Sequence, residues 1–287
     1  MKPDLLSVLQ NGMPTFSKGQ KKIAGYLTEH FDKAAYLTAA QLGQAAGVSE
    51  STVVRFAGEL GFEGYPQLQR ALQEVSRNML TAAQRMEVAS DQMDVNQVLE
   101  KVLHADIAKI RKTLDEMDKG AFDRAVDAII RARRIFLIGT GSAAVLMNFL
   151  AFYLNHIFDN VRPVGASGND VFENILSIGQ GDVLIGLSFP RYSSRTVKAM
   201  QYASSCRATV IAITDSLDSP IAESADHLLL ACSDMVSFAD SLVAPLSLIN
   251  ALIVALGLRC KDEVSQKLQR LEQLWQENAV YKGRHGI

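Results

Sequence analysis

The chain of 287 residues contains few cysteines, and their spacing suits neither a metal site nor a disulfide framework. Its three cysteines, Cys206, Cys232 and Cys260, lie far apart and form no CxxC pair. An odd number of widely spaced cysteines is typical of free thiols in a reducing compartment. We therefore expect a cytoplasmic protein that has no disulfide and binds no metal.

The sequence also has no excess of charge of one sign. Its formal net charge is −2, so composition alone does not indicate a nucleic-acid partner, and any such binding has to come from local placement of positive charge. The hydrophobic content of 48% is ordinary for a globular protein, and the length is sufficient for two domains with separate cores.

An apolar run long enough to cross a membrane is missing too. Residues 242–258 carry no charge, but they are fewer than the roughly 20 residues that a spanning helix needs. The run also contains Pro245, Ser247 and Asn250. We expect a helix that is buried in the core or in a subunit interface, and no membrane contact.

Residues 38–60 show the pattern of two short helices joined by a tight turn. Thr38 is placed to cap the first helix, and Ser49 is placed to cap the second. Between them, Gly47 occupies the position where the turn needs a left-handed backbone. This arrangement is typical of a helix-turn-helix.

The second of these helices has one apolar and one polar face. Val53, Phe56 and Leu60 recur at helical spacing and are expected to face the core. The outward residues near its start are Glu50, Ser51, Thr52 and Arg55. A recognition helix contacts base edges with its N-terminal residues, so this pattern favours DNA binding over the alternative of an ordinary helical hairpin.

The predicted DNA contacts come from the second helix and from residues around it. Side chains of the helix are expected to contact bases or backbone, and neighbouring lysines and a tyrosine to contact phosphates. These residues are Ser49, Ser51, Thr52, Arg55, Lys18, Lys21, Lys22 and Tyr65.

The coarse organisation is an all-α helix-turn-helix domain over residues 1–77, a linker over 78–97 and an α/β domain over 98–287. In the last part, short apolar runs alternate with helical stretches, which predicts a doubly wound parallel sheet covered on both faces. The expected strands are 134–139, 161–164, 182–187, 208–214 and 227–231, and the expected final helix is 262–281.

Three segments follow these strands, at the edge where such sheets bind ligands. Residues 139–144 contain glycines and Ser142 but do not complete GxGxxG, which disfavours a dinucleotide, and we expect no cofactor. Residues 214–220 are expected to form a turn whose hydroxyls either contact a ligand or cap the local backbone. The segment 188–196 carries hydroxyls and arginines suited to an anion. The residues expected to bind it are Ser142, Ser188, Arg191, Ser193 and Thr196. In the alternative interpretation, Ser193 or Ser194 only caps a helix and the arginines are solvated.

The chain resembles the RpiR/MurR family of bacterial transcriptional regulators over nearly its whole length. The resemblance is carried by Val48–Phe56 with Leu60–Tyr65, and by the strand and loop segments 135–143 and 183–196. That family joins a helix-turn-helix domain to a sugar isomerase (SIS) domain. The resemblance implies that the SIS domain senses a small metabolite, often a sugar phosphate, and changes operator affinity.

The ligand loops depart from the family pattern at specific positions. Ser188 and Ser193 match the outer residues of the family's Ser-x-Ser-Gly-x-Thr loop, but Pro190 replaces the second serine and Arg191 the glycine. In the first loop the family hydroxyl would fall at Ala143, beside Ser142. These changes make Arg191 a candidate for binding a carboxylate or another anion.

We therefore expect a dimeric or tetrameric regulator that binds a double-stranded DNA operator and a small anionic metabolite, either a sugar phosphate or a carboxylate. No catalytic residues are predicted. A phosphosugar isomerase is the alternative, but it needs a base, and the loops offer no evident carboxylate or imidazole. A metabolite-binding scaffold without DNA contact is a third interpretation.

Overall fold

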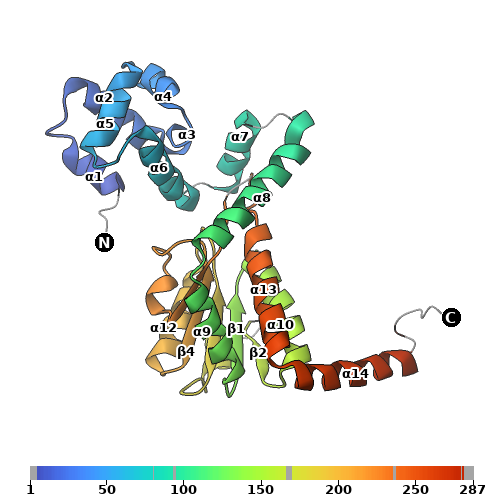
Figure 1. The fold of residues 1–287 in the computed structure, drawn as a ribbon. Coiled ribbons are helices and arrows are strands. Elements are labelled where there is room, and N and C mark those ends of the chain that lie inside the picture. The colour runs from blue at the N-terminus through green and yellow to red at the C-terminus, as the bar shows by residue number, and fades with distance from the viewer. Residues whose placement is uncertain are drawn as a thin grey trace. The chain divides into compact units, whose positions relative to one another are not determined.

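The computed structural model describes residues 5–79, 81–92, 95–165, 170–234, 237–278 and 280. Within these ranges the chain forms two compact units. The first is helical and extends to Val98, with a short segment that ends at Asp240. The second contains Leu99–Asp234 and the chain from Ser241 onward. In Figure 1 the helices α1 to α6 of the first unit are blue to teal, and the α/β unit runs from green to red.

The helices of the first unit pack around one apolar core. Phe16 and Phe56 meet edge to face in it, with ring centroids 5.2 Å apart. Ile23, Leu42 and Leu68 are fully buried and come from three different helices. The helices around this core are α1 (Leu5–Gly12), α2 (Lys18–Glu29), α3 (Phe31–Ala34), α4 (Ala39–Ala46), α5 (Glu50–Glu59) and α6 (Tyr65–Met79). They are followed by α7 (Ala82–Gln92) and a 3₁₀ turn at Val95–Gln97.

The start of α4 is capped by Thr38, as the sequence predicts, and Gln41 makes the capping reciprocal. The Thr38 hydroxyl accepts a hydrogen bond from the Gln41 backbone N–H at 3.2 Å, and the Gln41 side chain accepts one from the Thr38 N–H at 2.8 Å. The helix ends at Ala46 and is followed by its C-cap Gly47, which has a φ of 66°. The predicted left-handed turn residue is confirmed.

The second unit contains a five-stranded parallel sheet, and each of the five predicted apolar runs forms a strand. The sheet order is β2-β1-β3-β4-β5, all parallel. Its strands are β1 (Ile135–Gly139), β2 (Val161–Pro163), β3 (Val183–Leu187), β4 (Thr209–Thr214) and β5 (His227–Leu230). Its α-helices are α8 (Val98–Glu116), α9 (Lys119–Ile130), α10 (Ala143–Ile157), α11 (Val171–Ile175), α12 (Ser194–Ser205), α13 (Val243–Arg259) and α14 (Lys261–Glu277).

Alternating side chains of the strands fill two separate cores. Ile135 and Leu137 of β1 pack with α9, α10 and α13, whereas Phe136 and Ile138 pack with α11 and α12. Figure 1 shows α12 and α13 on opposite sides of the sheet. Because β1 lies between β2 and β3, the chain leaves the ends of β1 and β3 in opposite directions. In open α/β sheets, the carboxyl ends of two such strands are the usual place for a ligand.

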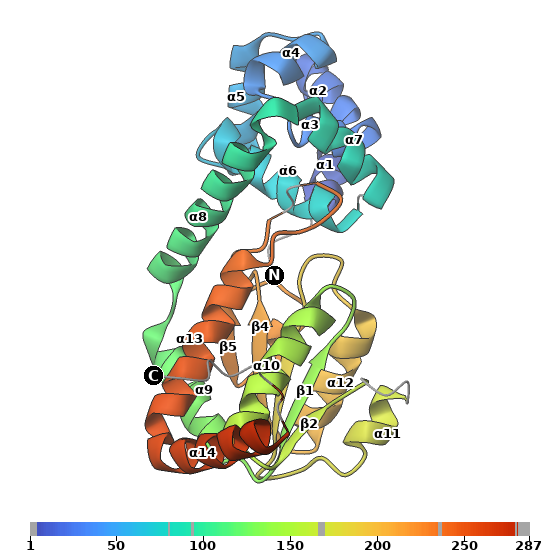
Figure 2. The ribbon, with the colours of Figure 1, turned by 90° about the vertical axis from the view of Figure 1, so that its right-hand side faces the viewer.

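The uncharged segment expected to be a buried helix forms most of α13. Leu248, Leu252 and Leu256 are buried, whereas Val254 and Leu258 are exposed. In the described ranges, no single helix has both the length and the apolar character needed to cross a membrane. The pair α13 and α14 meets that criterion only jointly and bends by 99° between the two helices (Figure 2). α14 ends at Glu277, and the predicted helix end at 281 lies outside the described residues.

Candidate nucleic-acid interface and ligand site

The start of α5 presents a polar surface on the side of the helix that faces away from the core. Val53 and Phe56 are fully buried, and Val48 in the turn packs partly buried against the same core. The opposite side of the helix faces solvent. Its exposed polar residues are Glu50, Ser51 and Arg55, with Thr52 half-buried beside them.

Three hydroxyls form a cluster at this helix start. The Ser49 Oγ lies 2.9 Å from Ser51 Oγ and 2.8 Å from Thr52 Oγ1. Ser49 occupies the N-cap position, but its side chain accepts no backbone N–H, so the expected side-chain cap is absent. The neighbouring hydroxyls have engaged Ser49 instead. The Ser49 side chain therefore accepts no hydrogen bond from the first backbone N–H groups of α5. Backbone N–H groups at the start of a helix attract phosphate.

The lysines predicted to contact phosphates lie on α2, next to the turn. Lys18, Lys21 and Lys22 are all exposed. The Lys22 ammonium group donates to the Gly47 carbonyl oxygen at 3.3 Å, which ties α2 to the helix-turn-helix. A Cβ on Gly19 would lie 3.4 Å from Thr52, so the first turn of α2 passes beside the start of α5. The structure thus gathers positive charge at the same end of α5 as the hydroxyls.

Tyr65 differs from the other predicted DNA contacts because it belongs to the core. Its side chain is 5% exposed, and its hydroxyl donates to the Leu37 carbonyl oxygen at 2.6 Å. Burial raises the pKa of Tyr65 to about 12. A phosphate contact does not fit this placement. The helical spacing of Tyr65 with Leu68 and Leu72 is the sequence signal for a buried position.

The three predicted ligand segments begin side by side at the carboxyl edge of the sheet. Gly139, Leu187 and Ile213 are neighbours in the strand register; the first segment begins at Gly139, and the other two begin directly after Leu187 and Ile213. Thr140 Oγ1 of the first loop lies 3.5 Å from Thr196 Oγ1 of the second. Ser142 is exposed at the N-cap of α10, and its side chain makes no capping bond there.

The second loop is closed by its own hydroxyls. Ser188 is 4% exposed, and its Oγ accepts a hydrogen bond from the Ser193 N–H at 3.3 Å. The Ser193 Oγ in turn accepts from the Thr196 N–H at 3.4 Å, so Ser193 caps α12 as the alternative interpretation holds. A hydroxyl oxygen has two lone pairs and a proton, so each retains capacity for a ligand.

Arg191 lies at the apex of this loop in a left-handed backbone conformation. Its φ is 62°, and its side chain is exposed. Residues other than glycine, asparagine and aspartate adopt this conformation at a cost of roughly 1–2 kcal/mol. The position is the one where the family pattern has glycine, the residue that adopts this conformation without that cost.

The third segment contributes a carboxylate that the sequence argument overlooked. Thr214 is buried and its hydroxyl donates to the Ser188 carbonyl oxygen at 2.8 Å, so it supports the second loop from inside. The Tyr192 hydroxyl donates to Asp215 Oδ1 at 2.9 Å. Asp215 follows β4 directly, which is the signal that would have identified it. In the part of the chain that the structure describes, no group of three or more His, Cys, Asp or Glu side chains is arranged to hold a metal ion.

Related proteins match both units. An uncharacterized HTH-type transcriptional regulator of Haemophilus influenzae is 29% identical over 75% of each chain. HexR of Escherichia coli, an HTH-type transcriptional regulator, is 26% identical over 97% of this chain and 96% of its own length.

Solved structures show the same folds. The sugar isomerase domain of an RpiR transcription factor from Sphaerobacter thermophilus matches 62% of this chain and 99% of its own, with 28% identity and a TM-score of 0.59. The Vibrio vulnificus NanR protein, complexed with ManNAc-6P, matches 94% of this chain and 98% of its own, with 22% identity and a TM-score of 0.58.

Two family models together account for most of the chain. The helix-turn-helix domain of the rpiR family matches residues 4–78. The SIS domain matches residues 128–255. The chain therefore belongs to the RpiR family of helix-turn-helix transcriptional regulators that carry a SIS domain.

Proposed function

We propose that the chain binds a two-fold symmetric operator as a homo-oligomer, with the start of α5 in the major groove. The exposed polar surface at Ser51 and Arg55, beside the lysines of α2, carries this proposal. Arg55 donates from Nε to the Ser51 carbonyl oxygen at 3.3 Å, which leaves both Nη groups outside that bond to contact a base or phosphate. Two such helices on one face of DNA require half-sites about 34–36 Å apart.

The proposed effector is a small anionic metabolite bound at the carboxyl edge of the SIS sheet. Support comes from the convergence of two hydroxyl-bearing loops at Thr140 and Thr196, and from the cationic residue Arg191 beside them. NanR carries a sugar phosphate, ManNAc-6P, so sugar phosphates are the first class to test, followed by small organic acids. Binding would change operator affinity by a coupling free energy of about 1–3 kcal/mol.

A gel shift with the full chain on the upstream region of its own gene tests the proposal. The expected result is a shift that one phosphorylated sugar or organic acid releases or strengthens, about five- to 150-fold in apparent affinity. The same compounds are assayed for isomerase turnover, because Asp215 places a carboxylate near the loops. If the chain turned over a compound and did not shift the DNA at low salt, the phosphosugar isomerase would become the better interpretation.

A further inference from the structure

One apolar side chain is exposed on the polar face of α5. Val54 is 44% exposed, although its neighbour Val53 is fully buried in the core of the helical unit. Among the side chains described in residues 5–79, Val54 is the one large hydrophobic residue that is exposed. It lies one turn after Ser51 and next to Arg55, and both of these are exposed as well. Val54 therefore belongs to the surface that is proposed to enter the major groove.

Neither the core nor the helix accounts for a valine at this position. An exposed side chain adds little to the core, and a β-branched residue is a poorer helix former than alanine, lysine or glutamate. Gly58 lies one turn further along the same face and is also exposed. A Cβ added to Gly58 would approach no packed neighbour within 4 Å, so packing does not require glycine there. Its missing side chain leaves Val54 open to close approach by another molecule.

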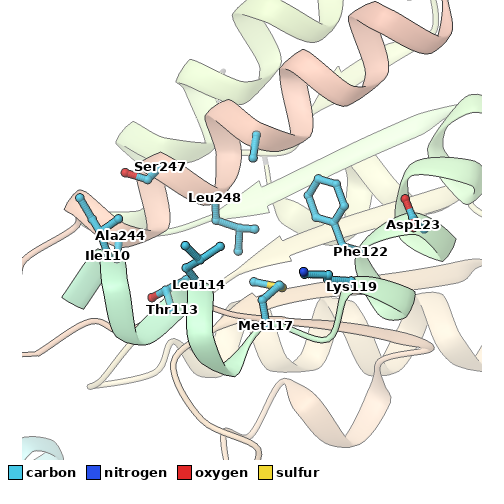
Figure 3. A pocket seen from close by; sticks show the side chains of 11 residues that line it. Ile110, Thr113, Leu114, Met117, Lys119, Phe122, Asp123, Ala244, Ser247 and Leu248 are labelled. Carbon is cyan, nitrogen blue, oxygen red and sulfur yellow. The ribbon is translucent and has the colours of Figure 1, made fainter. Parts of the chain in front are cut away.

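Val54 is too isolated to form a docking surface for a protein. An apolar docking surface ordinarily extends over several side chains. The groove of about 480 Å³ in the α/β unit has that extent, since Leu114, Phe122 and Leu248 line it together (Figure 3). On α5, the exposed residues around Val54 are polar or charged, or have no side chain. A partner that fits Val54 therefore presents a single small apolar group among hydrogen-bonding groups.

The major groove of DNA presents such a group. Thymine carries a C5-methyl group at its major-groove edge, beside the O4 acceptor, whereas the other three bases have no methyl group there. Val54 has two methyl groups and no hydrogen-bond donor or acceptor, so it can contact the methyl group of thymine but cannot satisfy a polar base edge. Ser51 and Arg55 beside it supply the hydrogen bonds to neighbouring bases or phosphates.

We propose that Val54 contacts the C5-methyl group of a thymine, so that each half-site of the operator contains a T·A pair at one fixed position. The inference rests on the proposed function, because it requires α5 in the major groove. It adds a specificity-determining residue that forms no hydrogen bond to the polar residues already assigned to the interface. A side chain that selects the methyl group discriminates thymine from cytosine and from both purines at that position.

Replacing thymine by uracil removes only the methyl group and therefore tests the contact. A footprint of the full chain on the upstream region of its own gene gives the half-sites. Each thymine is then replaced in turn by deoxyuridine, in both half-sites at once, and fluorescence anisotropy measures the affinity of each labelled duplex. At one position the replacement is expected to weaken wild-type binding about tenfold, because one methyl contact is lost in each half-site. Uracil outside the half-sites is the control and should leave the affinity unchanged.

Val54→Ala tests whether this side chain contacts the methyl group. The variant is expected to bind the thymine duplex about as weakly as the wild type binds the uracil duplex, and to lose no further affinity when uracil is introduced. Val254→Ala makes the same change at an exposed valine of α13 and should keep the wild-type ratio of the two affinities. Alanine is a better helix former than valine, so Val54→Ala should retain the fold, which circular dichroism checks.

The outcomes separate this inference from the proposed function. Wild-type binding to the thymine duplex reports on the function alone, and its absence at low salt would overturn both. If the wild type bound but no thymine were sensitive to replacement by uracil, the contact would be overturned and the function would stand. The contact would also be overturned if Val54→Ala discriminated thymine from uracil as strongly as the wild type, or if Val254→Ala lost that discrimination equally.

Discussion

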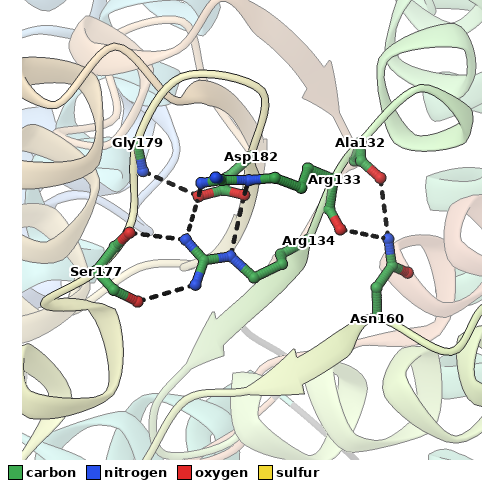
Figure 4. A network of polar contacts seen from close by, with 7 residues as sticks. All are labelled: Ala132, Arg133, Arg134, Asn160, Ser177, Gly179 and Asp182. Atoms are coloured by element: carbon green, nitrogen blue, oxygen red, sulfur yellow. Dashed lines mark hydrogen bonds and ion pairs between the residues drawn. The ribbon is translucent and has the colours of Figure 1, made fainter.

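Asp182 and Arg134 form a two-point ion pair at the amino end of β3. Arg134 Nε lies 3.1 Å from Asp182 Oδ1, and Nη2 lies 2.7 Å from Oδ2 (Figure 4). Arg133 donates to the same two oxygens, at 3.0 Å and 2.8 Å, and the Gly179 N–H donates at 2.9 Å. Burial alone would raise the pKa of this carboxyl, but the hydrogen bonds outweigh it and hold the pKa well below its usual range.

Asp182→Asn is expected to lower the free energy of unfolding by about 2–4 kcal/mol at neutral pH, because it leaves two guanidinium groups without their charge partner. The value is below that of a fully buried pair, since the Arg133 side chain is 60% exposed and solvent screens it. A depressed pKa stabilises the fold above the ordinary pKa of about 3.9, and this contribution is lost as the pH falls.

Urea unfolding at pH 7 and pH 3 measures that loss. The difference in free energy of unfolding between the wild type and Asp182→Asn should be smaller at pH 3, because the carboxylate of the wild type then contributes less stability. Asp115→Asn, at an exposed position of α8, is the control and should show no pH-dependent gap. An Asp182→Asn gap of equal size at both pH values would contradict the role assigned to the ion pair.

Gly43 of α4 lies where the two helices of the helix-turn-helix approach most closely. A Cβ there would lie 3.0 Å from the Val48 carbonyl oxygen and 3.2 Å from the Glu50 nitrogen, both backbone atoms. Gly25 of α2 has open space at the same position. Gly43→Ala should therefore unfold the helical unit more easily than Gly25→Ala, by about 1–3 kcal/mol.

The two variants have the same helix propensity, so thermal unfolding of both isolates the steric contribution. Gly25→Ala is expected to be neutral or stabilising by up to about 1 kcal/mol. If Gly43→Ala were equally stable, the close approach of α4 to α5 would not be needed for the fold.

The strands and the helix-turn-helix were predictable because local pattern decides them. Continuous apolar runs such as Val183–Leu187 are buried on both faces of a parallel sheet, and Gly47 marks a turn that requires a positive φ. The burial of Tyr65 and the missing cap of Ser49 were not predicted, because tertiary neighbours determine which groups these side chains contact. The Leu37 carbonyl and the hydroxyls near Ser49 are not visible as partners in the sequence.

The candidate ligand site was predictable in its location but not in its chemistry. The strand order determines that the loops after β1 and β3 meet, and Ser188 and Thr196 could be placed there from the sequence. That Ser193 engages the helix start, and that Tyr192 and Asp215 are hydrogen-bonded, follows only from the folded loop.

Arg55→Ala is expected to weaken operator binding by about 1–3 kcal/mol, because it removes the guanidinium from the start of the proposed recognition helix. Fluorescence anisotropy with a labelled operator duplex measures the change. Arg70→Ala, which removes the same charge from an exposed position of α6, is the control and should cost less than the Arg55 change. Equal losses would mean that general electrostatic attraction explains the effect, and no loss in either would remove Arg55 from the interface.

Arg191 and Arg207 allow the ligand role of an arginine to be separated from its backbone geometry. Both have a φ of 62° and exposed side chains. Arg191 follows the carboxyl end of β3, whereas Arg207 precedes the amino end of β4, at the other edge of the sheet. Replacing either by glycine removes the cost of roughly 1–2 kcal/mol that a side chain adds to the left-handed conformation. The same change makes the unfolded chain more flexible, which lowers the stability by about 0.5–1 kcal/mol. Both variants should therefore stay within about 1 kcal/mol of wild-type stability.

Only Arg191→Gly is expected to change ligand binding. Loss of one charged hydrogen-bond donor should weaken the affinity for the most responsive anion of the gel-shift panel about tenfold or more, measured by calorimetry with the full chain. Arg207→Gly should bind that anion as the wild type does. Because the two changes are identical in residue and backbone conformation, a difference between them reports the position of the guanidinium at the ligand loops. Equal affinities in both variants and the wild type would show that Arg191 does not contact the anion, and the hydroxyls of the two loops would then be its remaining candidate ligands.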